Sequence, residues 1–266
     1  MSNRNTEATQ ESPKGRMDVF KGLDPAVRER TKKMLMYFII FAVVMLFAGF
    51  TSAYIVSNIG QYWVHIEPPS SLWIGNALLV TSSLPMYLSL RAMKHGHARM
   101  SFVHLILTFA LGLGFATMQR EGWKELEAKG IGSRWAETGR WVTIKNLIEG
   151  PAIWGKDYTI TQNGEELYFR AETKEMFAPD DPFLKEDISL DVTSISNSSS
   201  GYLGILIVMH LLHLALGLTY LVVNGIRVLK GTIHPGDTVR LHTAGVYWHF
   251  LGLLWIYLFA FLFFIH

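Results

Sequence analysis

Five long apolar stretches, separated by polar segments, dominate the pattern of the chain. They cover residues 34–57, 72–90, 101–118, 202–226 and 241–266. Neither the first nor the last of these stretches contains Asp, Glu, Lys or Arg. A helix rises about 1.5 Å per residue, so roughly 20 apolar residues cross the approximately 30 Å hydrocarbon core of a bilayer. The pattern therefore predicts an all-α polytopic membrane protein with five transmembrane helices.

The polar segments set the rest of the organisation. Residues 1–33 are predicted to be a disordered cytoplasmic tail followed by the start of a juxtamembrane helix, with Pro25 at the first helical position. Residues 34–119 hold transmembrane helices 1–3, and residues 202–266 hold helices 4–5. Tyr62 and Trp63 are expected in a short loop between the first two helices.

Residues 120–201 form a hydrophilic insertion with 15 acidic and 10 basic residues. Two alternating runs flank Asn163-Gly164 within residues 156–171, which predicts a β-hairpin. Residues 140–147 are a candidate further strand, and residues 179–200 are expected to be loop. The insertion is predicted to be a small extramembrane cap that contains β structure.

Basic residues gather in the short connections and before the first helix. Arg91, Lys94 and Arg99 lie between helices 2 and 3 without an acid, and Arg227, Lys230 and Arg240 lie around the connection between helices 4 and 5. By the positive-inside rule, the N-terminus is cytoplasmic, whereas the insertion and the C-terminus are on the other side. In a bacterium, this is the cytoplasmic membrane with the insertion in the periplasm.

The composition argues against several kinds of site and partner. Only 17% of residues are charged, and the mean hydropathy is +0.22. The absence of cysteine excludes disulfides, iron–sulfur clusters and thiolate metal sites. A net charge of +2 gives no reason to expect a nucleic-acid partner.

The last two apolar stretches carry a double motif. The first reads Met209-His210-Leu-Leu-His213, and the second reads Tyr247-Trp248-His249-Phe250 with Trp255 after it. Together they resemble the last two helices of the subunit III family of haem-copper oxidases, the cytochrome c oxidase subunit III family. Residues 47–54, FAGFTSAY, resemble a segment of the same family, and the resemblance covers roughly residues 34–123 and 201–266.

This resemblance implies a non-catalytic subunit of a terminal oxidase that passes electrons from cytochrome c to oxygen in aerobic respiration. Such a subunit has no active site or cofactor of its own, and its partners are the catalytic subunit I, which holds haem and copper, and other oxidase subunits. It also implies bound phospholipids. The insertion is a candidate contact for a cytochrome c domain or a neighbouring respiratory complex. The predicted lipid-cleft or helix-packing residues are His210, His213, His242, Trp248, His249 and Trp255.

Three acidic residues of the family pattern are missing. Val43 and Gly252 stand where the family usually has acids, and His242 stands where it often has glutamate. None of the five apolar stretches contains Asp or Glu, so a carboxylate proton relay through this chain's membrane core is not expected.

Two alternatives remain open from the sequence. One is an autonomous b-type cytochrome, because neutral imidazole commonly ligates haem iron and His210 or His213 could pair with His249. The other is subunit III of a quinol oxidase, because this subunit does not hold the donor site. A transporter is disfavoured by the lack of membrane acids and of internal repeats. The two tryptophans fit either packing or a lipid cleft, and small residues such as Gly49, Ala53 and Gly112 offer close helix contacts.

Overall fold

The computed structural model describes residues 25–57, 62–129, 148, 150–181, 183–194 and 199–265. Its elements are α1 (Pro25–Ser57), β1 (Tyr62–Ile66), α2 (Ser70–Lys94), α3 (Ala98–Ala128), β2 (Tyr158–Gln162), β3 (Glu165–Glu166), β4 (Tyr168–Arg170), β5 (Glu175–Phe177), α6 (Ser189–Ser194), α7 (Ser199–Leu229), α8 (Val239–Ala260) and the π-helix η1 (Phe261–Ile265).

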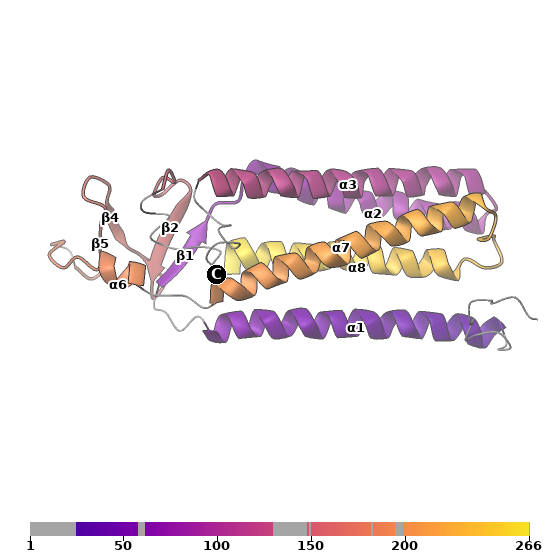
Figure 1. Cartoon of the computed structure of the whole chain (residues 1–266), viewed down its shortest axis with the longest axis horizontal. Helices are drawn as coiled ribbons and strands as arrows, with labels where there is room; N and C mark the ends of the chain where they lie inside the picture. Colours follow the sequence, from indigo (N-terminus) through magenta and orange to yellow (C-terminus); the bar gives the residue numbers. More distant parts are fainter. Residues whose placement is uncertain are drawn as a thin grey trace, which may run out of the picture.

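Five long helices lie lengthwise beside one another, and the strands form a cap at one end (Figure 1). The start of α1, the α2–α3 connection and the α7–α8 connection all lie at the opposite end. All three basic segments of the sequence are therefore at one end of the bundle, away from the cap. The helix α3 continues beyond its apolar stretch to Ala128, at the cap end.

Four of these helices are long and apolar enough to cross a membrane: α1, α3, α7 and α8 with its π-helical end. The sequence predicted five such helices, and these four are confirmed as long and apolar enough. The stretch at residues 72–90 is helical, as part of α2. It is less apolar than the others because it contains Asn76 and four serines or threonines, at positions 81, 82, 83 and 89.

The polar residues of α2 mostly have partners inside the bundle. Ser89 is fully buried, and its Oγ donates to the carbonyl oxygen of Ser101 in α3 at 2.9 Å. Ser71 bonds to the carboxylate of Glu125 near the other end of the same helix pair. These bonds tie α2 and α3 into an antiparallel hairpin along their whole length.

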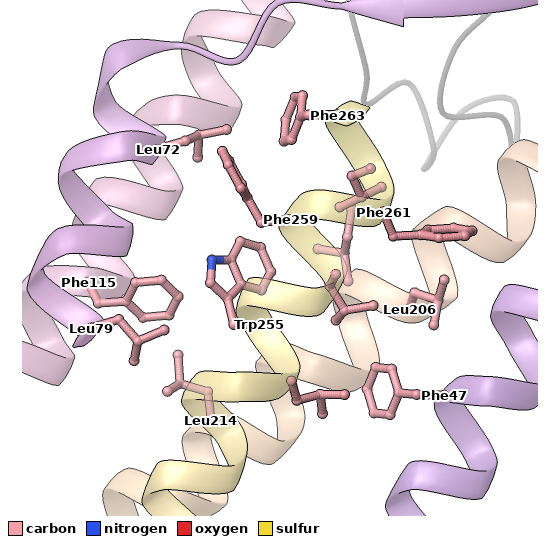
Figure 2. Close-up of a cluster of buried hydrophobic side chains, with 14 of the residues drawn as sticks. Phe47, Leu72, Leu79, Phe115, Leu206, Leu214, Trp255, Phe259, Phe261 and Phe263 are labelled. Carbon is pink, nitrogen blue, oxygen red and sulfur yellow. The ribbon is translucent and has the colours of Figure 1, made fainter. Parts of the chain in front are cut away.

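The last helix is at the centre of the bundle. Half of the residues in its most apolar part are buried, whereas 17% are buried in the most apolar part of α1, which lies at the periphery. Figure 2 shows Trp255 extending from α8 toward Phe115 of α3, while Phe47 reaches in from α1. A side chain added at Gly49 of α1 would meet nothing within 4 Å, so the small-residue contact expected there is not made with any described residue.

The predicted hairpin at Asn163-Gly164 is confirmed. Strands β2 and β3 pair antiparallel, with Gln162 opposite Glu165. The turn residues Asn163 and Gly164 have φ of 54° and 91°, and left-handed conformations at both positions are what a two-residue type I′ turn requires.

The cap also contains structure that was predicted as loop. Residues 62–66, expected to be a loop at Tyr62 and Trp63, form β1, which pairs antiparallel with β2 over five residues. Residues 179–200, also expected to be loop, include α6 and the start of α7. Pairing between segments almost 100 residues apart has no local signature, which explains why β1 was missed. The candidate strand at residues 140–147 lies outside the described residues.

Asp157 joins the cap to the end of α3. Its carboxylate accepts hydrogen bonds from Lys129 Nζ at 2.8 Å and from the Ile153 N–H at 2.9 Å. Its own carbonyl oxygen accepts from the N–H of Glu67, just after β1. These two hydrogen bonds hold the pKa of Asp157 below its ordinary value, and the bond from Lys129 has the larger effect. A lowered folded-state pKa means that this stabilisation is present above the ordinary carboxyl pKa and is lost as the pH falls.

Asp157→Asn is expected to loosen the cap by about 1–3 kcal/mol, since it removes a charged hydrogen-bond acceptor from a nearly buried site. Hydrogen exchange of the amides in β1 and β2, corrected for intrinsic rates, should be faster in the variant at pH 7. The difference from wild type should shrink as the pH falls below the ordinary carboxyl pKa of about 4 and the wild-type carboxylate becomes protonated. Asp180→Asn, at an exposed cap position, is the control and should leave exchange unchanged. Equal protection in wild type and Asp157→Asn at pH 7 would contradict this role.

Candidate functional site

Two tryptophans seat α8 against α2. Trp248 Nε1 donates to Ser82 Oγ at 3.0 Å, and Trp255 Nε1 donates to Asn76 Oδ1 at 2.8 Å. Both tryptophan side chains are buried. The earlier tryptophan bonds to the later residue of α2, and the later tryptophan bonds to the earlier one. The two helices therefore lie antiparallel, with one indole hydrogen bond near each end of their contact.

Gly112 of α3 makes room for the first of these rings. A Cβ atom at this position would lie 2.6 Å from Cη2 and 2.9 Å from Cζ2 of Trp248. The close helix contact predicted at Gly112 is therefore present, and its partner is an indole ring of α8.

The predicted histidines on α7 have different neighbours. The His210 ring is buried and lies 4.8 Å from the Trp255 ring, centroid to centroid. His213 is half-buried, its Nδ1 lies 2.6 Å from the carbonyl oxygen of Met209, and its ring is 5.8 Å from that of Phe47. His210 therefore faces α8, whereas His213 faces α1.

The predicted histidines on α8 do not join them. His242 is in the first turn of α8, at the end away from the cap, and its buried Nδ1 has no hydrogen-bond partner. His249 is half-buried beside Trp248 in sequence. Within the described part of the chain, no three His, Asp or Glu side chains are grouped so that they could hold a metal ion.

The structure does bring His210 and Trp255 together, at a pocket of about 570 Å³ between α3, α7 and α8. Its walls are mainly apolar, and charged residues of the last turns of α3 stand at its edge. The lining residues are Phe115, Ala116, Gln119, Arg120, Trp123, Lys124, Glu127, Ile207, His210, Leu211, Leu214 and Trp255.

Two polar side chains in this pocket lack partners. Both ring nitrogens of His210 and both amide atoms of Gln119 are buried without a hydrogen bond. His210 is 2% exposed and Gln119 is 5% exposed. Buried polar groups in folded proteins are nearly always paired with protein or ordered water, because leaving one unpaired costs about 1–3 kcal/mol. Four such atoms at one pocket indicate that something polar occupies it.

Sequence reasoning missed Gln119, Asn76 and Ser82 as site residues. Gln119 lies just beyond the third apolar stretch, at residues 101–118, and serines such as those of the second stretch are common in membrane helices. A usable signal was present, since burying an amide side chain costs free energy unless it finds a hydrogen-bond partner.

Comparison with known proteins gives a partial likeness. No protein-family model matches the chain. The chain is 34% identical over 55 residues to cytochrome c oxidase subunit 3 of Alkalihalophilus pseudofirmus, a match that covers 21% of this chain and 27% of that protein. The chain thus spans about a quarter of the length of this curated relative.

Proposed function

We propose that this chain is a non-catalytic subunit of a haem-copper terminal oxidase, in which it stabilises the catalytic subunit and holds lipid. The partial likeness to cytochrome c oxidase subunit 3 carries this proposal. The double motif of the last two helices supports it, because its tryptophans act here as buried anchors of α8. In this proposal haem and copper belong to the partner, and His210, His213, His242 and His249 serve packing or lipid contacts.

We propose five membrane crossings, with α2 as the fifth. The helix is 25 residues long, and it lies antiparallel to α3 and α8, both of which are apolar enough to span. Its polar side chains at Ser82 and Ser89 are fully buried and bonded, so they do not face acyl chains. The end that carries the basic connections is then cytoplasmic, and the cap and the C-terminus are periplasmic.

The cap is proposed to contact a partner on the periplasmic side, either a cytochrome c domain or a neighbouring respiratory complex. Among the described cap residues 150–194 there are ten acidic side chains and four basic ones. A surface of this sign would favour a basic partner by electrostatic steering, with an association rate that falls as salt is added.

Deletion of the gene tests the proposed role. Membranes from the deletion strain should consume oxygen at a rate that declines during sustained turnover, while the haem spectrum of the remaining oxidase is unchanged. Wild-type protein and the surface control Asp180→Asn should both restore a steady rate. Oxygen consumption that is steady and undiminished without the chain would contradict a role in the oxidase.

A further inference from the structure

The cap carries two strongly exposed apolar side chains outside the helical bundle. Phe183 is 75% exposed and Leu190 is 80% exposed, and among the described residues no other large apolar side chain is as exposed. Both belong to residues 183–191, here called the cap tip. Figure 1 shows α6, which includes Leu190, on the side of the cap away from the five long helices. Acyl chains around the helices therefore do not reach Leu190, and water covers it unless a partner does.

A tight turn presents Phe183 at the surface. The carboxylate of Asp181 accepts a hydrogen bond from the Phe183 N–H at 3.2 Å. It accepts two more from the N–H groups of Lys185 and Glu186, at 2.6 Å and 3.0 Å. Within this turn Leu184 has φ of 48°, a conformation that is rare for a bulky residue. The three bonds hold the turn in spite of this backbone angle, so the exposed ring is already in place and less entropy is lost when a partner binds.

Acidic side chains flank the two apolar ones. Glu186, Asp187 and Asp191 are exposed, and Lys185 is the one basic residue of the cap tip, which is fully described. Hydrogen bonds from the hydroxyl and then the N–H of Ser189 lower the pKa of Asp187, so this carboxylate stays ionised near neutral pH. Exposed apolar side chains with a charged rim are typical of a protein–protein contact.

We propose that the cap tip is a docking surface for a cationic periplasmic protein domain, one whose lysines or arginines surround an apolar centre. Phe183 and Leu190 contact that centre, and the flanking acids attract the cations. This inference rests on the proposed contact between the cap and a periplasmic partner, and it adds the place and the chemistry. Two apolar side chains and a few acids make a small surface, which suits the transient docking of an electron-carrier domain better than a permanent joint between two complexes.

Lys185 allows a test of opposite sign. Its Nζ lies 5.2 Å from the centroid of the Phe183 ring, so a cation already covers part of the ring face. The same charge repels a cationic partner. Lys185→Gln uncovers the ring and removes the repulsion, so it should strengthen binding about two- to threefold. Damage to the turn would change binding in the other direction.

The test uses the full chain in its complex, placed in lipid nanodiscs and immobilised, with a lysine-rich cytochrome c as the soluble probe. Surface plasmon resonance measures the dissociation constant from about 20 to about 200 mM salt. Phe183→Ser combined with Leu190→Ser should weaken binding about tenfold throughout, because it removes the apolar centre. Ile153→Ser is the matched control, since Ile153 is 56% exposed but lies next to the contact of Asp157 with α3. It should bind as wild type does.

The charged rim is tested separately. Glu186→Gln combined with Asp191→Asn should weaken binding about fivefold at low salt and by less at high salt, because added ions screen the attraction. Glu165→Gln combined with Glu166→Gln makes the same change in net charge at the β2–β3 hairpin. This control should have a clearly smaller effect. Acetylation of the probe's lysines should abolish its binding.

Each outcome bears on one proposal. Saturable binding with these variant effects supports the docking surface. A lack of saturable binding, equal binding by wild type and both cap-tip variants, or unchanged binding of the acetylated probe would overturn it. A complex that contains the oxidase but does not bind the probe rejects the docking surface alone. A chain that binds the probe but is never found with an oxidase rejects the proposed function alone.

Photo-crosslinking in native membranes identifies the natural partner. With p-benzoylphenylalanine in place of Leu190, the chain should crosslink to a protein domain of positive net charge. The same group in place of Ile153 should not form this crosslink. A neutral or acidic domain, or no crosslink from position 190, would contradict the proposed chemistry.

Discussion

Trp248→Ala is expected to release α8 from the groove between α2 and α3. The indole is 2% exposed and packs against Gly112, and its N–H is bonded to Ser82, so truncation leaves a large cavity and an unpaired hydroxyl oxygen. Tryptophan-to-alanine changes in well-packed interiors cost about 3–5 kcal/mol, a large share of the stability of a domain. The measurement is the unfolding midpoint in a titration of sodium dodecyl sulfate into dodecylmaltoside micelles, followed by circular dichroism.

The hydrogen bond can be separated from the packing by a double-mutant cycle. Ser82→Ala leaves the indole N–H unpaired, whereas Trp248→Phe removes that N–H and keeps an aromatic ring. The double variant should therefore lose less stability than the sum of the two single variants. Strict additivity would show that the hydrogen bond itself adds no stability. A Trp248→Ala protein as stable as wild type would show that α8 does not depend on this contact.

Gly112→Ala is expected to destabilise the bundle by about 1–3 kcal/mol, although alanine is normally the better helix former. The added methyl would lie 2.6 Å from Cη2 of Trp248, a ring already held by Ser82, so one helix must move. The same titration measures the effect. Trp248 fluorescence is not needed, since circular dichroism reports the loss of helix directly.

Gly49→Ala is the matched control for this change. It makes the same substitution in another apolar helix, at a position where the new methyl would meet none of the described residues within 4 Å. It should be neutral or slightly stabilising in the isolated chain, as expected from helix propensity. If both variants behave alike, the close approach at Gly112 is not a determinant of stability.

The sequence predicted the helices well where the signal was local. Apolar stretches of membrane length gave α1, α3, α7 and α8, and Asn163-Gly164 gave the turn of the cap hairpin. The helix α2 was found too, although its buried serines and Asn76 make it too polar for the apolar span that was expected. Those polar residues are bonded to other helices, and this is visible only after the helices are packed.

The candidate site was predicted only in part. His210 and Trp255 do lie together at one pocket, whereas His213, His242, Trp248 and His249 do not line it. The spacing of His210 and His213 suggested one shared face, but three residues on a helix differ by 60° in direction, enough to turn one ring to α8 and the other to α1. Gln119 comes from a helix about 90 residues earlier, and no sequence pattern linked it to His210.

The central claim, a subunit bound to a haem-copper oxidase, is tested most directly by affinity purification of the full chain from native membranes in mild detergent. The co-purifying chains are identified, and a reduced-minus-oxidised spectrum is recorded for the complex and for the chain after dissociation. The account predicts a haem-copper catalytic subunit in the complex and no Soret band from the separated chain. A chain that is purified alone with stoichiometric haem would contradict it and would make the histidines haem ligands.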